Sequence, residues 1–207
     1  AAADAGFAAV EFLWPTGENL DAIPQAIQKA GVKVVLFNTD GGDLSKGERG
    51  RLNDPSQREY VLKNFRDALD LAREIRCPRL HPLVGNALPD VPRHEQLAHV
   101  AEMLKEMASL ADKAGIRLDV EALNSIEIPR YLVTNTRQAL ALLEMVGSPV
   151  VQYQYDVYHL QRMEGNLIAT LRQHIDKIGH IQIADSPARH QPGTGEINYR
   201  NVLGTLE

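Results

Sequence analysis

The chain has 207 residues, 44% hydrophobic and 24% charged, which fits one globular domain and excludes collagen-like, strongly disordered or membrane-spanning chains. Its 27 acidic and 22 basic side chains give a net charge of -5, so we expect neither nucleic acid nor a membrane surface as a partner. The single cysteine, Cys77, cannot form an internal disulfide, and we therefore expect a cytoplasmic protein.

Short apolar runs alternate with longer amphipathic segments along the chain. The first six residues resemble the last turn of a helix with Gly6 as its stop. Six runs rich in branched and aromatic residues then predict strands. These runs cover residues 8–13, 32–37, 79–84, 116–123, 150–156 and 180–184.

Two helical patterns between these strands are especially clear. The first covers residues 55–75, where Asp54 can cap the helix and Pro55 takes the first helical position. We expect its apolar stripe to include Tyr60, Val61, Phe65, Leu69 and Ala72. The second covers residues 94–114. Helices that end on a glycine directly before a strand, at Gly31, Gly115 and Gly147, predict a repeated βα unit.

A repeated βα unit predicts a parallel sheet, either open or closed into a barrel. No Gly-x-Gly-x-x-Gly turn follows a strand, which disfavours dinucleotide binding. Polar side chains instead stand at the carboxyl ends of four different strands, the rim where a barrel assembles its chemistry. They are Asn38, Glu121, Asp156 and Gln182. Because a barrel needs eight strands, either the fold is another one or a strand is missing at each end.

Three of these strand ends could carry chemistry. Glu121 could instead be a solvated charge or a helix-cap partner, and Asp156 a capping residue. The pair His180 and Gln182, which share a strand face, could equally be buried, hydrogen-bonded polar groups. Together, two carboxylates and an amide oxygen on one rim favour Mg²⁺ or Mn²⁺ over zinc. Three ligands are few for such an ion, so a further protein group or substrate oxygens would complete the site.

Longer motifs surround the same residues. The segments EALN at 121–124, DVYH at 156–159, EGNL at 164–167 and HIQIADSPARHQPGTGEINY at 180–199 closely resemble the hydroxypyruvate isomerase family. That family belongs to the xylose isomerase-like TIM barrels. The resemblance extends over nearly the whole chain, including AGF at 5–7 and GERG at 47–50.

The resemblance implies a divalent-metal site with ligands on strands five, six, seven and eight of the barrel. The first three fall on Glu121, Asp156 and Gln182, and Glu121 also inherits a role in proton transfer. The strand-eight glutamate has no counterpart, since Glu196 matches a loop position. We therefore expect residues 1–207 to form a single α/β domain, an incomplete (β/α)8 TIM barrel without its first and eighth strands.

The implied reaction is the interconversion of hydroxypyruvate and tartronate semialdehyde through an enediolate, assisted by Mg²⁺ or Mn²⁺. His159, Arg189 and Glu127 resemble substrate contacts of the wider family, which includes ketose 3-epimerases. Without a contact to substrate, His159 would make a supporting hydrogen bond, Arg189 would be a surface charge, and Glu127 would be a solvated loop carboxylate. His81 could line the pocket or be a satisfied core histidine, and Cys77 is expected to be a buried, inert thiol.

Other functions stay open beside this one. A 2-oxo-tetronate isomerase or a ketose 3-epimerase would use the same metal and glutamates, and a noncatalytic sugar-acid-binding protein would lack the second glutamate. A DNA-repair endonuclease of this fold needs many zinc-binding histidines and a basic face, which this acidic chain lacks. The expected partner is a small hydroxy or oxo acid, and the strand edges of an open barrel favour association into a homo-oligomer.

Overall fold

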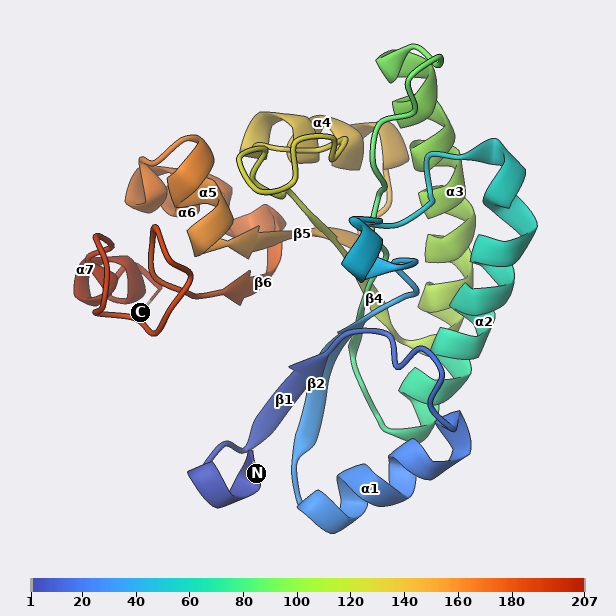
Figure 1. The fold of residues 1–207 in the computed structure, drawn as a ribbon, viewed down its shortest axis with the longest axis horizontal. Coiled ribbons are helices and arrows are strands. Elements are labelled where there is room, and N and C mark those ends of the chain that lie inside the picture. Colours follow the sequence, from blue (N-terminus) through green and yellow to red (C-terminus); the bar gives the residue numbers. More distant parts are fainter. Residues whose placement is uncertain (1, 207) are drawn as a thin grey trace.

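The computed structural model describes residues 2–206. Its centre is a six-stranded parallel sheet in which each strand pairs with the next one along the chain. The sheet curls into part of a barrel, with β1 and β6 at its two open ends (Figure 1). The strands are β1 Ala9–Phe12, β2 Lys33–Asn38, β3 Arg79–His81, β4 Arg117–Glu121, β5 Val151–Asp156 and β6 Ile178–Gln182.

Helices connect the strands and cover the outer side of the curl (Figure 1). They are α1 Ile23–Ala30, α2 Arg58–Glu74, α3 Arg93–Ala114, α4 Thr136–Val146, α5 Val157–Met163, α6 Leu167–His174 and α7 Tyr199–Leu203. This arrangement confirms the expected incomplete (β/α)8 barrel, and all six strands lie within three residues of their predicted bounds. The glycine caps are confirmed too, because Gly31, Gly115 and Gly147 each end a helix in the left-handed conformation.

Alternation along the strands separates an apolar outer face from a polar interior. On β4, Leu118 and Val120 are fully buried in the core that the sheet forms with the helices. Asp119, between them, points inward, where Arg79 Nη1 donates to its Oδ1 at 3.0 Å and to Gln152 Oε1 at 3.0 Å. This part of the interior is therefore lined by hydrogen-bonded polar side chains.

The helix predicted over residues 55–75 begins with a 3₁₀ turn, Pro55–Gln57, and Asp54 accepts from the backbone of Ser56 as the expected cap. One detail of its predicted apolar stripe is wrong. Phe65, Leu69 and Ala72 are buried as expected, but Tyr60 is exposed. Its hydroxyl bonds to Asp40 instead of entering the core, so hydrophobicity alone placed this amphipathic side chain incorrectly.

Two expectations, an inert Cys77 and the absence of a membrane span, can be compared with the structure. Cys77 is buried, and burial raises the pKa of its thiol to about 11, which makes it inert at neutral pH. Within the described residues, no helix is both long and apolar enough to cross a membrane.

Candidate metal and active site

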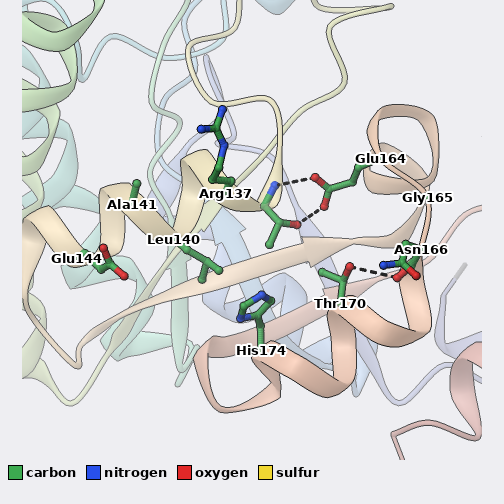
Figure 2. Close-up of a pocket in the computed structure, with 10 residues that line it drawn as sticks. Arg137, Leu140, Ala141, Glu144, Glu164, Gly165, Asn166, Thr170 and His174 are labelled. Carbon is green, nitrogen blue, oxygen red and sulfur yellow. Dashed lines mark hydrogen bonds between the residues drawn. The ribbon is translucent and has the colours of Figure 1, made fainter.

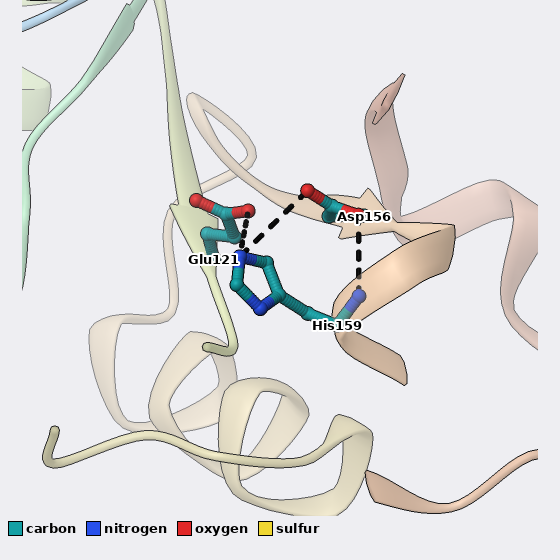
Figure 3. Close-up of side chains that lie close together, drawn as sticks. All are labelled: Glu121, Asp156 and His159. Carbon is teal, nitrogen blue, oxygen red and sulfur yellow. Dashed lines mark hydrogen bonds and ion pairs between the residues drawn. The ribbon is translucent and has the colours of Figure 1, made fainter. Parts of the chain in front are cut away.

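Two strand ends and the helix that follows them bring three ionisable side chains together. Glu121 ends β4, Asp156 ends β5, and His159 lies in the first turn of α5 (Figure 3). One ligand atom from each lies within 4.8 Å of the others, and all three side chains are buried. Residues 35 positions apart therefore converge because the parallel strands end at the same rim.

The Glu121 carboxyl occupies an unfavourable position for a charge. It is 5% exposed, and burial raises its pKa well above the usual range, with the negative charge of Asp156 raising it further. His81 Nδ1 lies 3.6 Å from Glu121 Oε2, beyond a good hydrogen bond. A buried group that holds a proton strongly and lies beside a second carboxylate is typical of a metal or acid/base site.

Asp156 is a helix cap, and only one of its two carboxylate oxygens is used for the cap. Its Oδ1 caps α5 by accepting from the backbone N–H groups of Tyr158 at 2.8 Å and His159 at 3.2 Å. Its Oδ2 points instead into the cluster, where Arg189 Nη2 donates to it at 3.0 Å. The cap therefore orients the carboxylate and leaves one oxygen for the site.

The hydrogen bonds of His159 determine which ring nitrogen carries its proton. Nδ1 accepts a hydrogen bond from the backbone N–H of Asn124 at 3.1 Å, and a backbone N–H can only donate. Burial lowers the pKa of His159 to about 4, so the ring is neutral at pH 7. A neutral imidazole whose Nδ1 accepts must carry its proton on Nε2. His159 therefore presents a donor toward Glu121 Oε1 and Asp156 Oδ2, 3.9 and 3.8 Å away, rather than a lone pair for a metal.

Gln182 ends β6 directly opposite Asp156 in the strand register. Its Oε1 accepts from Gln154 Nε2 at 2.8 Å, and its Nε2 donates to Glu11 Oε2 at 2.6 Å. His180 contacts the other oxygen of Glu11, so the expectation that residues 180 and 182 share a face is confirmed. Glu11 and Gln154 are polar partners that the sequence did not single out.

His81 lies beneath Glu121 on the inner face of β3. It is 1% exposed, and burial lowers the pKa of its ring to about 3. Its Nδ1 pairs with Asn38 Nδ2 at 3.0 Å, while its Nε2 is buried without a hydrogen-bond partner. His81 is therefore a neutral core histidine that borders the site and is only half satisfied.

Glu127 lies outside the cluster. Its carboxylate accepts from Asn124 Nδ2 at 3.0 Å and from the Tyr158 hydroxyl. Burial opposes ionisation, but these two hydrogen bonds prevail and lower its pKa. Asn124 also contacts His159, so Glu127 connects to the cluster through this side chain.

Arg189 is carried by the loop between β6 and α7. Asp185, a buried residue just after the strand, accepts backbone hydrogen bonds from Gly193 at 2.7 Å and Ile197 at 3.0 Å and so closes the loop. Gly195 is required there, because a Cβ would lie 2.1 Å from the carbonyl oxygen of Ser186. The Arg189 guanidinium also lies over the Tyr158 ring, 5.1 Å from its centroid.

A separate surface pocket lies between α4 and α6 (Figure 2). Arg137, Glu144 and His174 line it, and Glu164 at its edge accepts from the backbone N–H and hydroxyl of Thr136. None of the strand-end acids reaches this pocket. The rim, where buried groups with shifted pKa values converge, is therefore the candidate site.

The donor set at the rim fits a divalent cation. Asp156 Oδ2 and Glu121 offer carboxylate oxygens, and the amide oxygen of Gln182 stands on the adjacent strand end. Two buried carboxylates this close resist ionising together, and a cation would remove that conflict.

Known proteins resemble the chain over its full length. A family model described as "Xylose isomerase-like TIM barrel" matches residues 1–207. Hydroxypyruvate isomerase from Escherichia coli (strain K12) is 37% identical over 206 residues, which cover 100% of this chain and 80% of that protein. 2-oxo-tetronate isomerase from Pectobacterium atrosepticum is 35% identical over 210 residues, covering 100% of this chain and 79% of that protein.

A solved structure has the same fold at similar identity. The crystal structure described as an AP endonuclease, family 2, from Brucella melitensis superimposes with a TM-score of 0.94 at 33% identity. The match covers 99% of this chain and 79% of that one.

Proposed function

Since the chain belongs to the xylose isomerase-like TIM barrel family and is an isomerase, we propose that it interconverts hydroxypyruvate and tartronate semialdehyde. The observation that carries this proposal is the buried Glu121 beside Asp156 at the carboxyl end of the barrel. Moving a proton between adjacent carbons needs a basic group in a dry pocket and a means to stabilise negative charge on oxygen.

The metal ligands in this proposal are Glu121, Asp156 and Gln182. A bound Mg²⁺ or Mn²⁺ would supply Lewis-acid stabilisation to the substrate oxygens. Glu121 removes the proton from the hydroxyl-bearing carbon and returns it to the former carbonyl carbon, through an enediolate, while the hydroxyl proton passes from the first oxygen to the former carbonyl oxygen. The proton on Nε2 of His159 makes this residue a donor to a substrate oxygen, which agrees with a substrate contact and not with a ligand.

Three further residues complete the proposed pocket. Arg189 is the cation for the substrate carboxylate, and Glu127 holds His159 in place through Asn124 at the pocket edge. His81 forms the floor below Glu121. We place this activity in the cytoplasm, because the one thiol is buried and unpaired.

Proton exchange tests the reaction directly. In heavy water with Mn²⁺, the protein should wash deuterium into hydroxypyruvate faster than the metal alone does, and chelation should abolish the difference. Mass spectrometry of the recovered acid measures the exchange. A folded, Mn²⁺-bound protein that catalyses no exchange would contradict the hydroxypyruvate assignment.

Substrate comparison separates the second candidate, a 2-oxo-tetronate isomerase. The relative from Pectobacterium atrosepticum makes this reaction a specific alternative, and it would use the same acids with a longer substrate. The ratio of kcat/KM for hydroxypyruvate and for a 2-oxo-tetronate decides between them. A ratio above one supports our proposal, and a ratio below one transfers the same mechanism to the four-carbon acid.

Cleavage of a phosphodiester is less consistent with this chain. The described residues bring together one metal-type cluster, and it holds a single histidine whose Nδ1 is already bonded. The net charge of -5 also opposes binding to a nucleic-acid backbone.

Replacing Arg189 by alanine should have two opposite effects. KM for hydroxypyruvate should rise by roughly tenfold, because a half-exposed charged hydrogen bond contributes toward the lower end of the usual range. Affinity for Mn²⁺ should increase, because in the parent protein the guanidinium pairs with Asp156 Oδ2 and repels a cation there. Steady-state kinetics and calorimetric titration measure the two effects.

Arg172→Ala, an exposed arginine on α6, is the matched control and should change neither value. Unchanged KM in Arg189→Ala would remove the role of Arg189 in substrate binding.

A further inference from the structure

Glu11 joins the two open ends of the sheet. It lies on β1, whereas its partners His180 and Gln182 lie on β6, and these strands are not neighbours in the sheet. Both of its carboxylate oxygens are engaged, Oε1 with His180 Nε2 at 2.6 Å and Oε2 with Gln182 Nε2 at 2.6 Å. The contact bridges the open side of the sheet, and one of its two partners, Gln182, is a proposed metal ligand.

Two irregularities in the sheet aim these side chains at one another. The register of β1 against β2 shifts between Val10 and Glu11. The register of β5 against β6 shifts at Gly179, where a Cβ would lie 2.4 Å from Arg79 Nη1. Gly179 and His180 both face the interior as a result, which a regular strand would not allow. Such bulges serve to re-aim side chains near functional sites.

The amide of Gln182 has two possible orientations, and its neighbour Gln154 does not choose between them. Gln154 Nε2 now donates to Gln182 Oε1, while Gln154 Oε1 is buried without a partner. If both amides turned over, the hydrogen bond between them would be restored in the opposite sense. The side chain of Gln154 also bonds to Glu121, but Glu121 holds a proton strongly and can therefore either donate or accept. A partner of fixed polarity is needed to select one orientation.

We propose that Glu11 is a positioning residue that holds the oxygen of the Gln182 amide, and not its NH₂ group, toward the metal site. A carboxylate only accepts, so the side of Gln182 that faces Glu11 must be the NH₂ group. The carbonyl oxygen then has one lone pair for Gln154 and one for a cation. This inference rests on the proposed function, because it takes Gln182 as a ligand.

Calorimetric titration of the metal-free protein with Mn²⁺ tests the role. Glu11→Met keeps the length of the side chain but removes the acceptor, and it should weaken Mn²⁺ binding by about tenfold or more, as loss of an outer partner of a metal ligand does. Glu11→Gln can still offer an oxygen to Gln182 and should bind Mn²⁺ within about threefold of the parent.

The Gln182→Glu background separates positioning from mere support of the barrel. A carboxylate has two equivalent oxygens, so a ligand at position 182 no longer needs to be oriented, and Glu11→Met should cause no loss of Mn²⁺ affinity there. An equal loss in both backgrounds would show a structural role and overturn the proposal, as would unchanged affinity of Glu11→Met in the parent.

The assignment of Gln182 as a metal ligand, on which the role of Glu11 depends, is tested by a separate variant. Gln182→Ala should weaken Mn²⁺ binding. If it does not, Gln182 is not a ligand, and both that assignment and the role of Glu11 fall. A loss in Gln182→Ala without a loss in Glu11→Met overturns the role of Glu11 alone and leaves the metal site intact.

Discussion

Replacing Glu121 by glutamine should reduce metal-dependent deuterium exchange by at least about 1,000-fold, because general-base catalysis typically contributes about 100- to 10,000-fold and Glu121 is also a proposed ligand. Glutamine has nearly the same shape and cannot take up the proton. Mass spectrometry under saturating Mn²⁺ measures the loss, so that a weaker metal affinity does not account for it.

The same variant should be more stable than the parent when no metal is present. Burial and the charge of Asp156 raise the pKa of Glu121, so the folded state holds this proton more tightly than the unfolded state does. The parent therefore loses stability as pH rises from the unfolded pKa toward the folded one. Glutamine carries no such loss, and we expect a gain of roughly 1–2 kcal/mol at neutral pH that diminishes toward acid pH.

Urea unfolding in the presence of a chelator, at pH 5 and at pH 8, measures this gain. Glu102→Gln, at an exposed position on α3, is the matched control and should alter neither stability nor exchange. A variant that loses activity and stability together would indicate that Glu121 supports the fold and would count against its role as a base.

The fold could be predicted because its local rules agree. Three helices end on a left-handed glycine directly before an apolar strand, and parallel strands place their last residues on one rim. For this reason Glu121 and Asp156, found as separate strand ends, could be expected to meet. Tyr60 departed from the pattern because its ring packs beside Arg51 while its hydroxyl reaches Asp40, and periodicity does not register that preference.

The finer geometry of the site depends on contacts that sequence spacing does not contain. Glu11 and Gln182 are 171 positions apart and lie on strands that do not pair. The tautomer of His159 follows from a backbone N–H of Asn124, which has no sequence signature. The pairing of Arg189 with Asp156 depends on how Asp185 closes a loop. The local pattern thus locates the proposed ligands, and tertiary hydrogen bonds set their orientation.

Asp156→Asn should separate the two roles of this residue. Asparagine caps helices about as well as aspartate, so its side-chain oxygen can keep the bonds to Tyr158 and His159 that Oδ1 now accepts. Stability should therefore change little. The charge that faces the site is lost, and Mn²⁺ affinity should fall by about 100-fold or more, beyond the usual effect of an outer partner.

Calorimetry with Mn²⁺ and thermal unfolding of the metal-free protein measure the two effects side by side. Asp54→Asn replaces another capping aspartate, which accepts from Ser56 far from the rim, and should leave both unchanged. Loss of the Asp156 charge should also lower the pKa of Glu121, since that charge helps to raise it. Full Mn²⁺ affinity in Asp156→Asn would mean that Asp156 is a helix cap and nothing more, and the metal site would have to be sought without it.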